Sequence, residues 1–327
     1  MTSPAEILTD PQAALDVLPV CDHYCGTAAR IAKSLQLQAQ MREEFGANVF
    51  DCTLDCEDGA PVGGETEHAH FIAEAALSAP EGTRLGVRVH PTDHPAFVDD
   101  LRIILSRAAA RLSYVMLPKT ESVADVICAE KIVTAIYPAG LPLHVLIESP
   151  AAVRRAFEIA AHPGVQSLSF GLMDFVSAHG GAIPAAGMTL GGQFSHPLIV
   201  RAKTEIASAA HAFGKTPSHC VVTEFKDADA IAHAARRAAR DFGFTRMWSI
   251  HPAQIRPIIE AFAPEESEIA AATEILTAAE KADWAPIDVR GQLHDRASYR
   301  YFWQILRRAH ATGRKLQPEV LNRFHFS

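Results

Sequence analysis

The feature that most constrains the fold is a regular alternation of short apolar runs with longer amphipathic stretches. In stretches such as residues 28–45 and 94–112, apolar side chains recur every three or four positions, as in helices that cover a sheet. The apolar runs are typical of buried strands and lie at residues 18–22, 48–55, 84–90, 112–118, 141–148, 165–171, 218–224 and 245–251. Strict alternation of strands and helices predicts a parallel sheet.

Two parallel architectures fit this pattern, a (β/α)8 TIM barrel and a doubly wound open sheet. The count favours the barrel, because roughly eight strand–helix units occupy about 260 residues. No GxGxxG motif follows the first strand. A barrel also gathers the carboxyl ends of its strands on one face, where barrel active sites lie. At these ends the sequence places polar residues: His23, Asp55, Glu57, Asp58, Arg88, His90, Lys119, Glu148, Asp174, Glu224 and His251.

The strand–helix pattern ends near residue 262. Residues 263–285 and 291–313 are then typical of two further helices. We predict a barrel catalytic domain over residues 1–262 and a C-terminal helical extension over 263–327, which covers the site or contacts another subunit. Residues 175–195 are rich in glycine and alanine and long for a strand–helix loop, which indicates a mobile lid or rim.

Composition argues against several classes of protein. The net charge of −8 and the absence of a Lys- or Arg-rich run make nucleic acid an unexpected partner. The first residues lack the features of a signal peptide, and no apolar run approaches the roughly 18 residues that a membrane span needs. We therefore expect a cytoplasmic protein. The pairs Cys21/Cys25 and Cys52/Cys56 are spaced four residues apart, which fits reduced buried thiols better than a zinc knuckle.

Glu148 and Asp174 are the main candidates for chemistry. Each comes where an apolar strand-like run stops, and a carboxylate there is costly unless a cation meets it. Two such acids on successive strands of one sheet make a site for Mg²⁺ or another hard divalent cation. The alternative is that they cap helices or pair with structural cations. We predict that they are metal ligands.

Arg88 and a neighbouring acidic cluster form a second candidate set. A buried arginine is rare unless it is paired, so Arg88 either grips the carboxylate of a substrate or bridges to Asp55, Glu57 or Asp58. We favour contact with substrate. Charges as close as those of the three acids resist ionising together unless a cation intervenes, and spacing alone assigns no single role to each.

Lys119 has two interpretations. A lysine at a strand end can form a Schiff base, as in some barrel aldolases, or it can pair with a nearby acid. The abundance of carboxylates favours the ion pair. Sixteen histidines are present, and none, including His90, is assigned as a general base.

Six segments, LDCEDGA, GVRVHP, VMLPKTES, LIESP, SFGLMD and WSIHPAQI, occur in this order. Together they resemble the citrate lyase beta-subunit-like family, which groups with malyl-CoA and citramalyl-CoA lyases in the HpcH/HpaI aldolase/citrate lyase superfamily. The resemblance extends from about residue 18 to residue 300, most of the chain. It implies a (β/α)8 barrel, a divalent metal that is usually Mg²⁺, and reversible carbon–carbon cleavage of a 3-hydroxyacyl-CoA into a keto acid and an acyl-CoA.

The resemblance also implies roles for individual residues. Glu148 and Asp174 would be the direct metal ligands, and Arg88 would contact the keto acid. Glu57 and Asp58 match a pair of acids near metal-bound waters, so Asp58 joins Arg88 as a catalytic candidate. The remaining implied site residues are Gly171, Leu172 and Met173, whose backbone amides would meet a substrate carboxylate, and Asp295.

Asp295 resembles a C-terminal aspartate that reaches into the neighbouring subunit's site, which implies a homotrimer or homohexamer. The chain departs from the family at two places. His90 stands where the family commonly has asparagine, and LPVCDHYCGTAAR replaces a basic RSxLxxPG stretch whose arginine helps to place CoA phosphates. Two other functions therefore stay open: an aldolase that acts on a free hydroxy-keto acid without CoA, and a non-catalytic barrel that binds a metabolite or a partner subunit.

Overall fold

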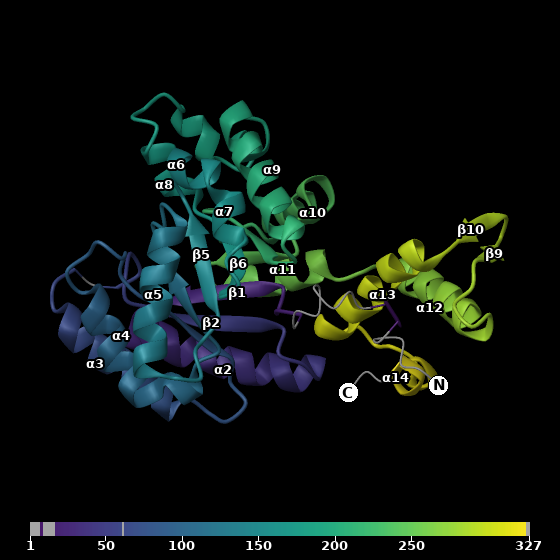
Figure 1. The fold of residues 1–327 in the computed structure, drawn as a ribbon, viewed down its shortest axis with the longest axis horizontal. Helices are drawn as coiled ribbons and strands as arrows, with labels where there is room; N and C mark the ends of the chain where they lie inside the picture. The colour runs from purple at the N-terminus through teal and green to yellow at the C-terminus, as the bar shows by residue number, and fades with distance from the viewer. Residues whose placement is uncertain (1–6, 9–16, 61, 325–327) are drawn as a thin grey trace.

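The computed structural model describes residues 7–8, 17–60 and 62–324. Within these residues, eight parallel strands close into a barrel in chain order, because β1 pairs with both β2 and β8 (Figure 1). This confirms the predicted (β/α)8 fold and excludes the open sheet. The strands are β1 (Cys21–Cys25), β2 (Phe50–Asp55), β3 (Leu85–Arg88), β4 (Tyr114–Leu117), β5 (Leu143–Ile147), β6 (Val165–Phe170), β7 (Thr216–His219) and β8 (Arg246–Ser249).

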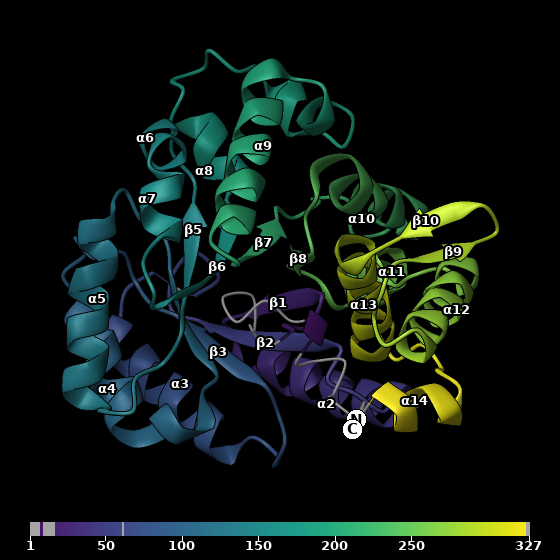
Figure 2. The same cartoon turned by 45° about the vertical axis from the view of Figure 1, so that its right-hand side comes forward.

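Helices surround the barrel and bury their apolar faces against the outer side of the strands (Figure 2). In the helix before β8, for example, Ile231, Ala234, Ala235 and Ala238 are buried at helical spacing. The α-helices are α2 (Ala28–Phe45), α3 (Glu65–Ser78), α4 (Phe97–Ala108), α5 (Val123–Ile136), α6 (Pro150–Arg154), α7 (Ala156–Ala160), α8 (Leu172–Ser177), α9 (Pro197–Ala212), α10 (Ala228–Phe242) and α11 (Pro252–Phe262). The described residues also form the short 3₁₀ helices η1 (Ala109–Arg111), η2 (Ala185–Met188) and η3 (Gly192–Phe194).

Ion pairs fill the amino-terminal end of the barrel interior. Arg246 is completely buried, and its guanidinium lies 3.2 Å from Asp22 Oδ2 and 2.7 Å from Asp51 Oδ2. Arg84 Nε donates to Asp51 Oδ1 at 2.7 Å, and the Tyr114 hydroxyl donates to Asp22 Oδ1 at 3.0 Å. Buried charges need partners of opposite sign, and these residues supply them to one another. This layer of ion pairs closes the amino-terminal end of the barrel interior. A binding site can therefore form at the opposite end, where the strands have their carboxyl ends.

The C-terminal extension lies beside the barrel (Figures 1 and 2). It contains α12 (Glu266–Lys281), β9 (Ile287–Val289), β10 (Gln292–His294), α13 (Arg296–Ala311) and α14 (Pro318–Phe324). Its side chains form an apolar cluster of their own, with Leu276, Trp284, Tyr299 and Leu306 buried in it and Leu8 packed against them. The predicted helical extension is therefore present, and its division from a 1–262 domain stays a prediction.

The seventh strand is offset from its predicted position. It covers Thr216–His219 rather than 218–224, and from Cys220 onward the chain is no longer in the sheet. Val221 and Val222 are buried all the same, because Val221 lines the cavity at the barrel mouth and Val222 packs in the main apolar core, so the pair resembles a strand in the sequence. Residues 175–195 form η2, η3 and the end of α8, with Ile183 and Phe194 buried, and motion of this segment as a lid stays a prediction.

None of the helices in the described part of the chain has the length and apolar composition that crossing a lipid bilayer would require.

Candidate active site

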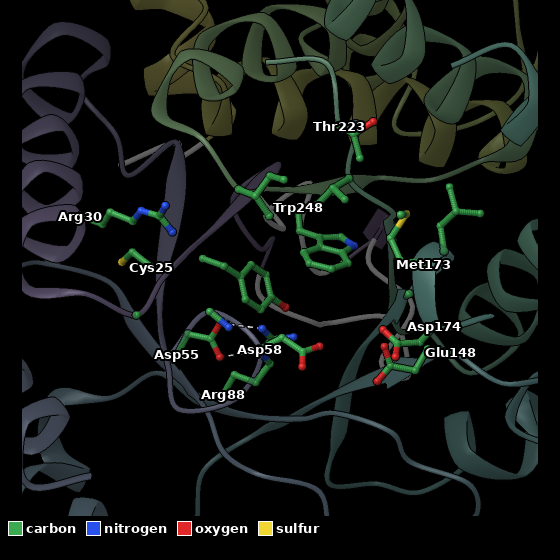
Figure 3. A pocket seen from close by; sticks show the side chains of 17 residues that line it. Cys25, Arg30, Asp55, Asp58, Arg88, Glu148, Met173, Asp174, Thr223 and Trp248 are labelled. Atoms are coloured by element: carbon green, nitrogen blue, oxygen red, sulfur yellow. Dashed lines mark hydrogen bonds and ion pairs between the residues drawn. The ribbon is translucent and has the colours of Figure 1, made fainter. Parts of the chain in front are cut away.

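A cavity of about 300 Å³ lies at the carboxyl ends of the strands (Figure 3). Its polar lining includes Arg30, Asp55, Asp58, Arg88, Glu148 and Asp174. Its apolar lining includes Tyr24, Leu172, Met173, Val221, Trp248 and Ile250. The structure thus brings together eight of the residues singled out in the sequence: Asp55, Asp58, Arg88, Glu148, Gly171, Leu172, Met173 and Asp174.

Glu148 and Asp174 lie close together on one side of the cavity (Figure 3). Glu148 directly follows β5 and is 6% exposed, and Asp174 is in the first turn of α8. Burial and the charge of Asp174 raise the pKa of Glu148 to about 7. Ionising two neighbouring carboxyl groups is costly, and a cation bound between them offsets this cost. Carboxylate oxygens are also the ligands that Mg²⁺ prefers.

The described residues contain no group of three or more His, Cys, Asp or Glu side chains able to hold a metal ion. A cation at Glu148 and Asp174 would therefore complete its coordination with water and substrate oxygens. Mg²⁺ sites usually have this composition, with one or two carboxylates from the protein. The donor set fits a catalytic cation better than a structural one.

Gly171 gives Glu148 its space. A Cβ atom at residue 171 would lie 2.3 Å from Glu148 Oε2 and 2.5 Å from Glu148 Cβ, so any larger residue would displace the carboxylate. The Gly171 amide donates to the Ile147 carbonyl at 3.1 Å and is occupied. The backbone amides of Gly171, Leu172 and Met173 were all expected to bind a substrate carboxylate. Only those of Leu172 and Met173 are available for this, because they lie at the start of α8, where backbone amides have no acceptor within the helix.

Arg88 ends β3 and is both paired and at the cavity. Its Nε and Nη2 donate to Asp55 Oδ1 at 2.7 Å and Oδ2 at 2.6 Å, and Nη1 lies 3.1 Å from Glu57 Oε2. A guanidinium carries five N–H groups. These contacts use three, so one N–H on each terminal nitrogen is left for a ligand. Asp55 and Glu57 thereby hold Arg88 rigidly in the cavity wall.

Lys119 connects the acidic cluster to Glu148. Its backbone is in the left-handed region with φ of 47°, which is costly for a lysine. This conformation directs its N–H onto Glu148 Oε1 at 2.5 Å, while its ammonium contacts Glu57 Oε1 and lies 3.7 Å from Asp58 Oδ1. Burial lowers the pKa of the Lys119 ammonium, but the bond to Glu57 and the nearby acids raise it overall. A protonated amine is not a nucleophile, so the geometry supports the ion-pair interpretation.

Asp55 and Asp58 of this cluster both line the cavity, and because Arg88 engages both oxygens of Asp55, Asp58 is the acid that is better placed to exchange a proton with a substrate. Burial and the neighbouring charge of Glu57 raise its pKa. A carboxyl group with a raised pKa at a cavity wall is suited to holding and passing a proton.

His90 and Asp295 are not brought into this cavity. His90 Nδ1 lies 2.6 Å from Asp100 Oδ2, and its ring stacks on His94 in a neighbouring cavity of about 290 Å³. Asp295 Oδ1 accepts from the amides of Ala297 and Ser298 and so begins α13. No described residue of the extension is part of the cavity lining.

Sequence reasoning missed Tyr24, Trp248 and Arg30. The rings of Tyr24 and Trp248 lie 4.8 Å apart, and the Arg88 guanidinium lies 5.0 Å from the Tyr24 centroid. The alternation in CDHYC was the available signal, because it turns Asp22 and Tyr24 to the barrel interior.

The expectation for His23 was wrong, because the same alternation turns His23 to the outer side of the barrel. There its Nδ1 lies 2.8 Å from Ser249 Oγ, and burial lowers its pKa to about 4.

A closed parallel barrel with buried acids and an arginine at its carboxyl face defines a barrel enzyme suited to metal-assisted chemistry on an anionic substrate. Residues 36–252 match the model of the HpcH/HpaI aldolase/citrate lyase family. The L-malyl-CoA/beta-methylmalyl-CoA lyase of Rhodobacter capsulatus is 32% identical over 274 residues, which cover 78% of this chain and 86% of that protein. The chain belongs to the HpcH/HpaI aldolase/citrate lyase family, as the resemblance predicted.

Solved structures agree with this assignment. A citrate lyase from Burkholderia xenovorans has a TM-score of 0.82 and 48% identity, over 100% of this chain and 99% of that one. CitE from Mycobacterium tuberculosis, in complex with magnesium, acetoacetate and coenzyme A, has a TM-score of 0.64 and 25% identity, over 90% of this chain and 99% of that one.

Proposed function

We propose that the chain is a metal-dependent carbon–carbon lyase that cleaves or forms a 3-hydroxyacyl-CoA thioester, with a keto acid and an acyl-CoA as the other side of the reaction. One observation carries this proposal: the buried carboxylate of Glu148 and the half-buried carboxylate of Asp174 share a cavity with Arg88, which has two N–H groups without a protein partner. The relatives named as malyl-CoA lyases support the reaction class.

The cofactor in this proposal is Mg²⁺ or another divalent cation, held by Glu148 and Asp174. When bound, it supplies Lewis-acid polarisation of a keto or hydroxyl oxygen and a template for the adjacent carboxylate. The solved relatives crystallised with magnesium support this choice.

The other residues position the substrate and handle protons. The two spare N–H groups of Arg88 bind an oxygen pair of the keto acid and stabilise the charge that develops there. Asp58 accepts the proton that the substrate hydroxyl loses before the carbon–carbon bond breaks. Tyr24 and Trp248 cover one side of the cavity with aromatic surface, which excludes water from the thioester enolate.

The acid that protonates the enolate carbon is, in this proposal, Asp295 of a neighbouring subunit. Asp295 is exposed and is not part of the lining of the active-site cavity of its own chain, which is consistent with a role in an oligomer, a homotrimer or a homohexamer. The extension that carries it then serves as the contact between subunits.

The proposal is tested by incubating the enzyme with malyl-, citramalyl- and citryl-CoA, with Mg²⁺ and with a chelator. Cleavage of at least one thioester is expected only in the presence of the cation. Glu148→Gln keeps the size of the side chain but removes a charged ligand, and loses several kcal/mol of catalysis, about 10³-fold in kcat.

Two outcomes would replace the proposal. Equal cleavage of a free hydroxy-keto acid that carries no CoA would establish the aldolase alternative. Stoichiometric binding of the cation without turnover of any of these compounds would establish the non-catalytic alternative.

A further inference from the structure

A polar cavity of about 480 Å³ lies where the C-terminal extension meets the barrel. The barrel side of its lining comes from α10, α11 and residues 263–264, and the extension side comes from α12 and α13 (Figure 2). Arg240 of this lining lies shortly before the start of β8, so the cavity lies toward the amino ends of the strands. It shares no described residue with the active-site cavity at the carboxyl ends, and we call it the junction cavity.

Arg308 of α13 lines the junction cavity with its hydrogen-bonding capacity unused. The side chain is half-buried, and no other described residue makes a hydrogen bond or an ion pair with its guanidinium. Burial lowers the pKa of Arg308, and the charge of the nearby Glu268 offsets this only in part. The buried arginines Arg88 and Arg246, by contrast, each contact two carboxylates. A guanidinium withdrawn from water is normally paired, so Arg308 lacks a partner that the other two have.

The other polar groups of the junction cavity suit an anion. Arg240 adds a second guanidinium, of which one N–H donates to Glu265 outside the lining. Tyr301 and Gln304 add a hydroxyl and an amide, both on exposed side chains. Glu268 is the acid of the described lining, and its Oε2 already accepts the Glu265 amide at 2.8 Å. Two cations and two neutral donors therefore face one acid that is partly engaged.

We propose that the junction cavity binds a small oxyanion, the carboxylate or phosphate group of a metabolite, between Arg308 and Arg240. A guanidinium matches either group with two parallel hydrogen bonds, which Arg308 has free. The Tyr301 hydroxyl and the Gln304 amide donate to the remaining oxygens. Because Arg240 belongs to the barrel and Arg308 to the extension, the bound anion connects the two parts of the chain. The site is separate from the proposed lyase reaction and does not depend on it.

The other polar cavity outside the active site suits an anion less well. The cavity at His90 is lined by Glu57, Asp58 and Glu65, and its cation Lys119 already contacts Glu57. Three acids repel an anion there, whereas the junction cavity holds an arginine that no acid engages. The unpaired guanidinium therefore distinguishes the junction cavity as an anion site.

The inference is tested by calorimetry of the full chain with inorganic phosphate and with malonate, without a divalent cation. At least one of these anions is expected to bind with a Kd on the order of 1 mM. Arg308→Met should weaken that binding about ten-fold or more, which is the loss of a charge-assisted contact. Arg300→Met is the matched control, because Arg300 is an exposed arginine of the same helix outside the lining, and it should bind like wild type. Binding of phosphate alone or of malonate alone identifies the class of metabolite.

Urea denaturation supplies an independent measurement. Removal of an unpaired, partly buried charge should leave Arg308→Met folded, and the anion that binds should raise the midpoint of wild type but not of this variant. If Arg308→Met does not fold, Arg240→Met replaces it, because this change removes only an exposed ion pair with Glu265. The site is overturned if wild type binds neither anion at about ten times the expected Kd. It is also overturned if the folded variant binds as tightly as Arg300→Met.

Discussion

Gly171 is the residue at which backbone geometry and the acid pair are most tightly connected. A side chain at this position would collide with Glu148 at 2.3 Å, so Gly171→Ala is expected to move that carboxylate. We predict that the variant folds normally and binds Mg²⁺ about ten-fold more weakly, as for other disturbances of ligand orientation. Isothermal calorimetry of cation binding and far-UV circular dichroism measure the two effects.

The matched control for Gly171→Ala is Gly191→Ala. A Cβ atom at Gly191 meets nothing within 4 Å, and the backbone there has an ordinary conformation with φ of −73°. This variant should bind the cation like wild type. Wild-type affinity in Gly171→Ala as well would show that Glu148 is not a ligand.

The two interpretations of Lys119, a Schiff-base nucleophile and an ion-pair partner, can be separated by experiment. We predict that cyanoborohydride treatment with pyruvate leaves no adduct on the protein, because the ammonium is held protonated by Glu57. Lys119→Arg keeps the positive charge and should retain partial activity. The activity of Lys119→Met should be about ten-fold lower than that of Lys119→Arg, because Glu57 then lacks its cationic partner. Intact-mass spectrometry and steady-state kinetics measure these outcomes, and a pyruvyl mass increase at Lys119 would restore the Schiff base.

Single residues could be predicted from the sequence where a charge interrupts an apolar run. Glu148 and Arg88 were found this way, because charged groups at the end of a buried strand require a reason. Tyr24, Trp248 and Arg30 could not be found, because an aromatic residue in a strand and an arginine on a helix are ordinary. Their role depends on which side of the barrel they face, and this is known only when the register is known.

At the scale of elements, helix α9 contains a buried charge outside the site. Lys203 is 0% exposed, its Nζ donates to Gln193 Oε1 at 3.0 Å, and burial lowers its pKa from 10.5 to about 8. Between these two pKa values the unfolded chain binds a proton that the folded chain does not. The free energy of unfolding therefore rises with pH in this window, and the full cost of the charge is present below pH 8.

Lys203→Met is predicted to raise the free energy of unfolding by about 2 kcal/mol at pH 7, since an apolar residue replaces a buried charge. Its advantage over wild type should shrink as the pH rises from 8 toward 10.5, and urea denaturation at both ends of this window measures the difference. Lys131→Met, at an exposed position of α5, should change little at either pH. A Lys203→Met variant less stable than wild type at pH 7 would show that the nearby Phe194 ring outweighs the cost of burial.

Element positions were predictable where burial and strand formation coincide. They coincide for β5 and β6, whose apolar runs lie between helices. At β7 they do not, because Val221 is buried in the cavity wall and Val222 in the core, both beyond the end of the strand. Sequence reports burial and cannot distinguish a sheet from a cavity wall as its cause.

At the scale of the whole molecule, the cross-subunit role of Asp295 predicts complementation. Asp295→Asn and Glu148→Gln should each be inactive alone. In co-expressed mixed oligomers, about one quarter of the sites combine an intact Glu148 with an intact neighbouring Asp295, so about one quarter of the activity should return. Steady-state assays of dual-tagged oligomers measure this return. If oligomers shown to be mixed recover no activity, either the acid comes from the same chain as Glu148 or Asp295 does not act as the acid.

The paired charges of Arg246, Asp22 and Asp51 have a kinetic consequence. A molecule held against Glu148 and Asp174 cannot pass through that packed ionic layer, and it leaves by the route through which it entered. Departure is then sequential: the fragment nearer the opening diffuses away first, and the one seated deepest follows.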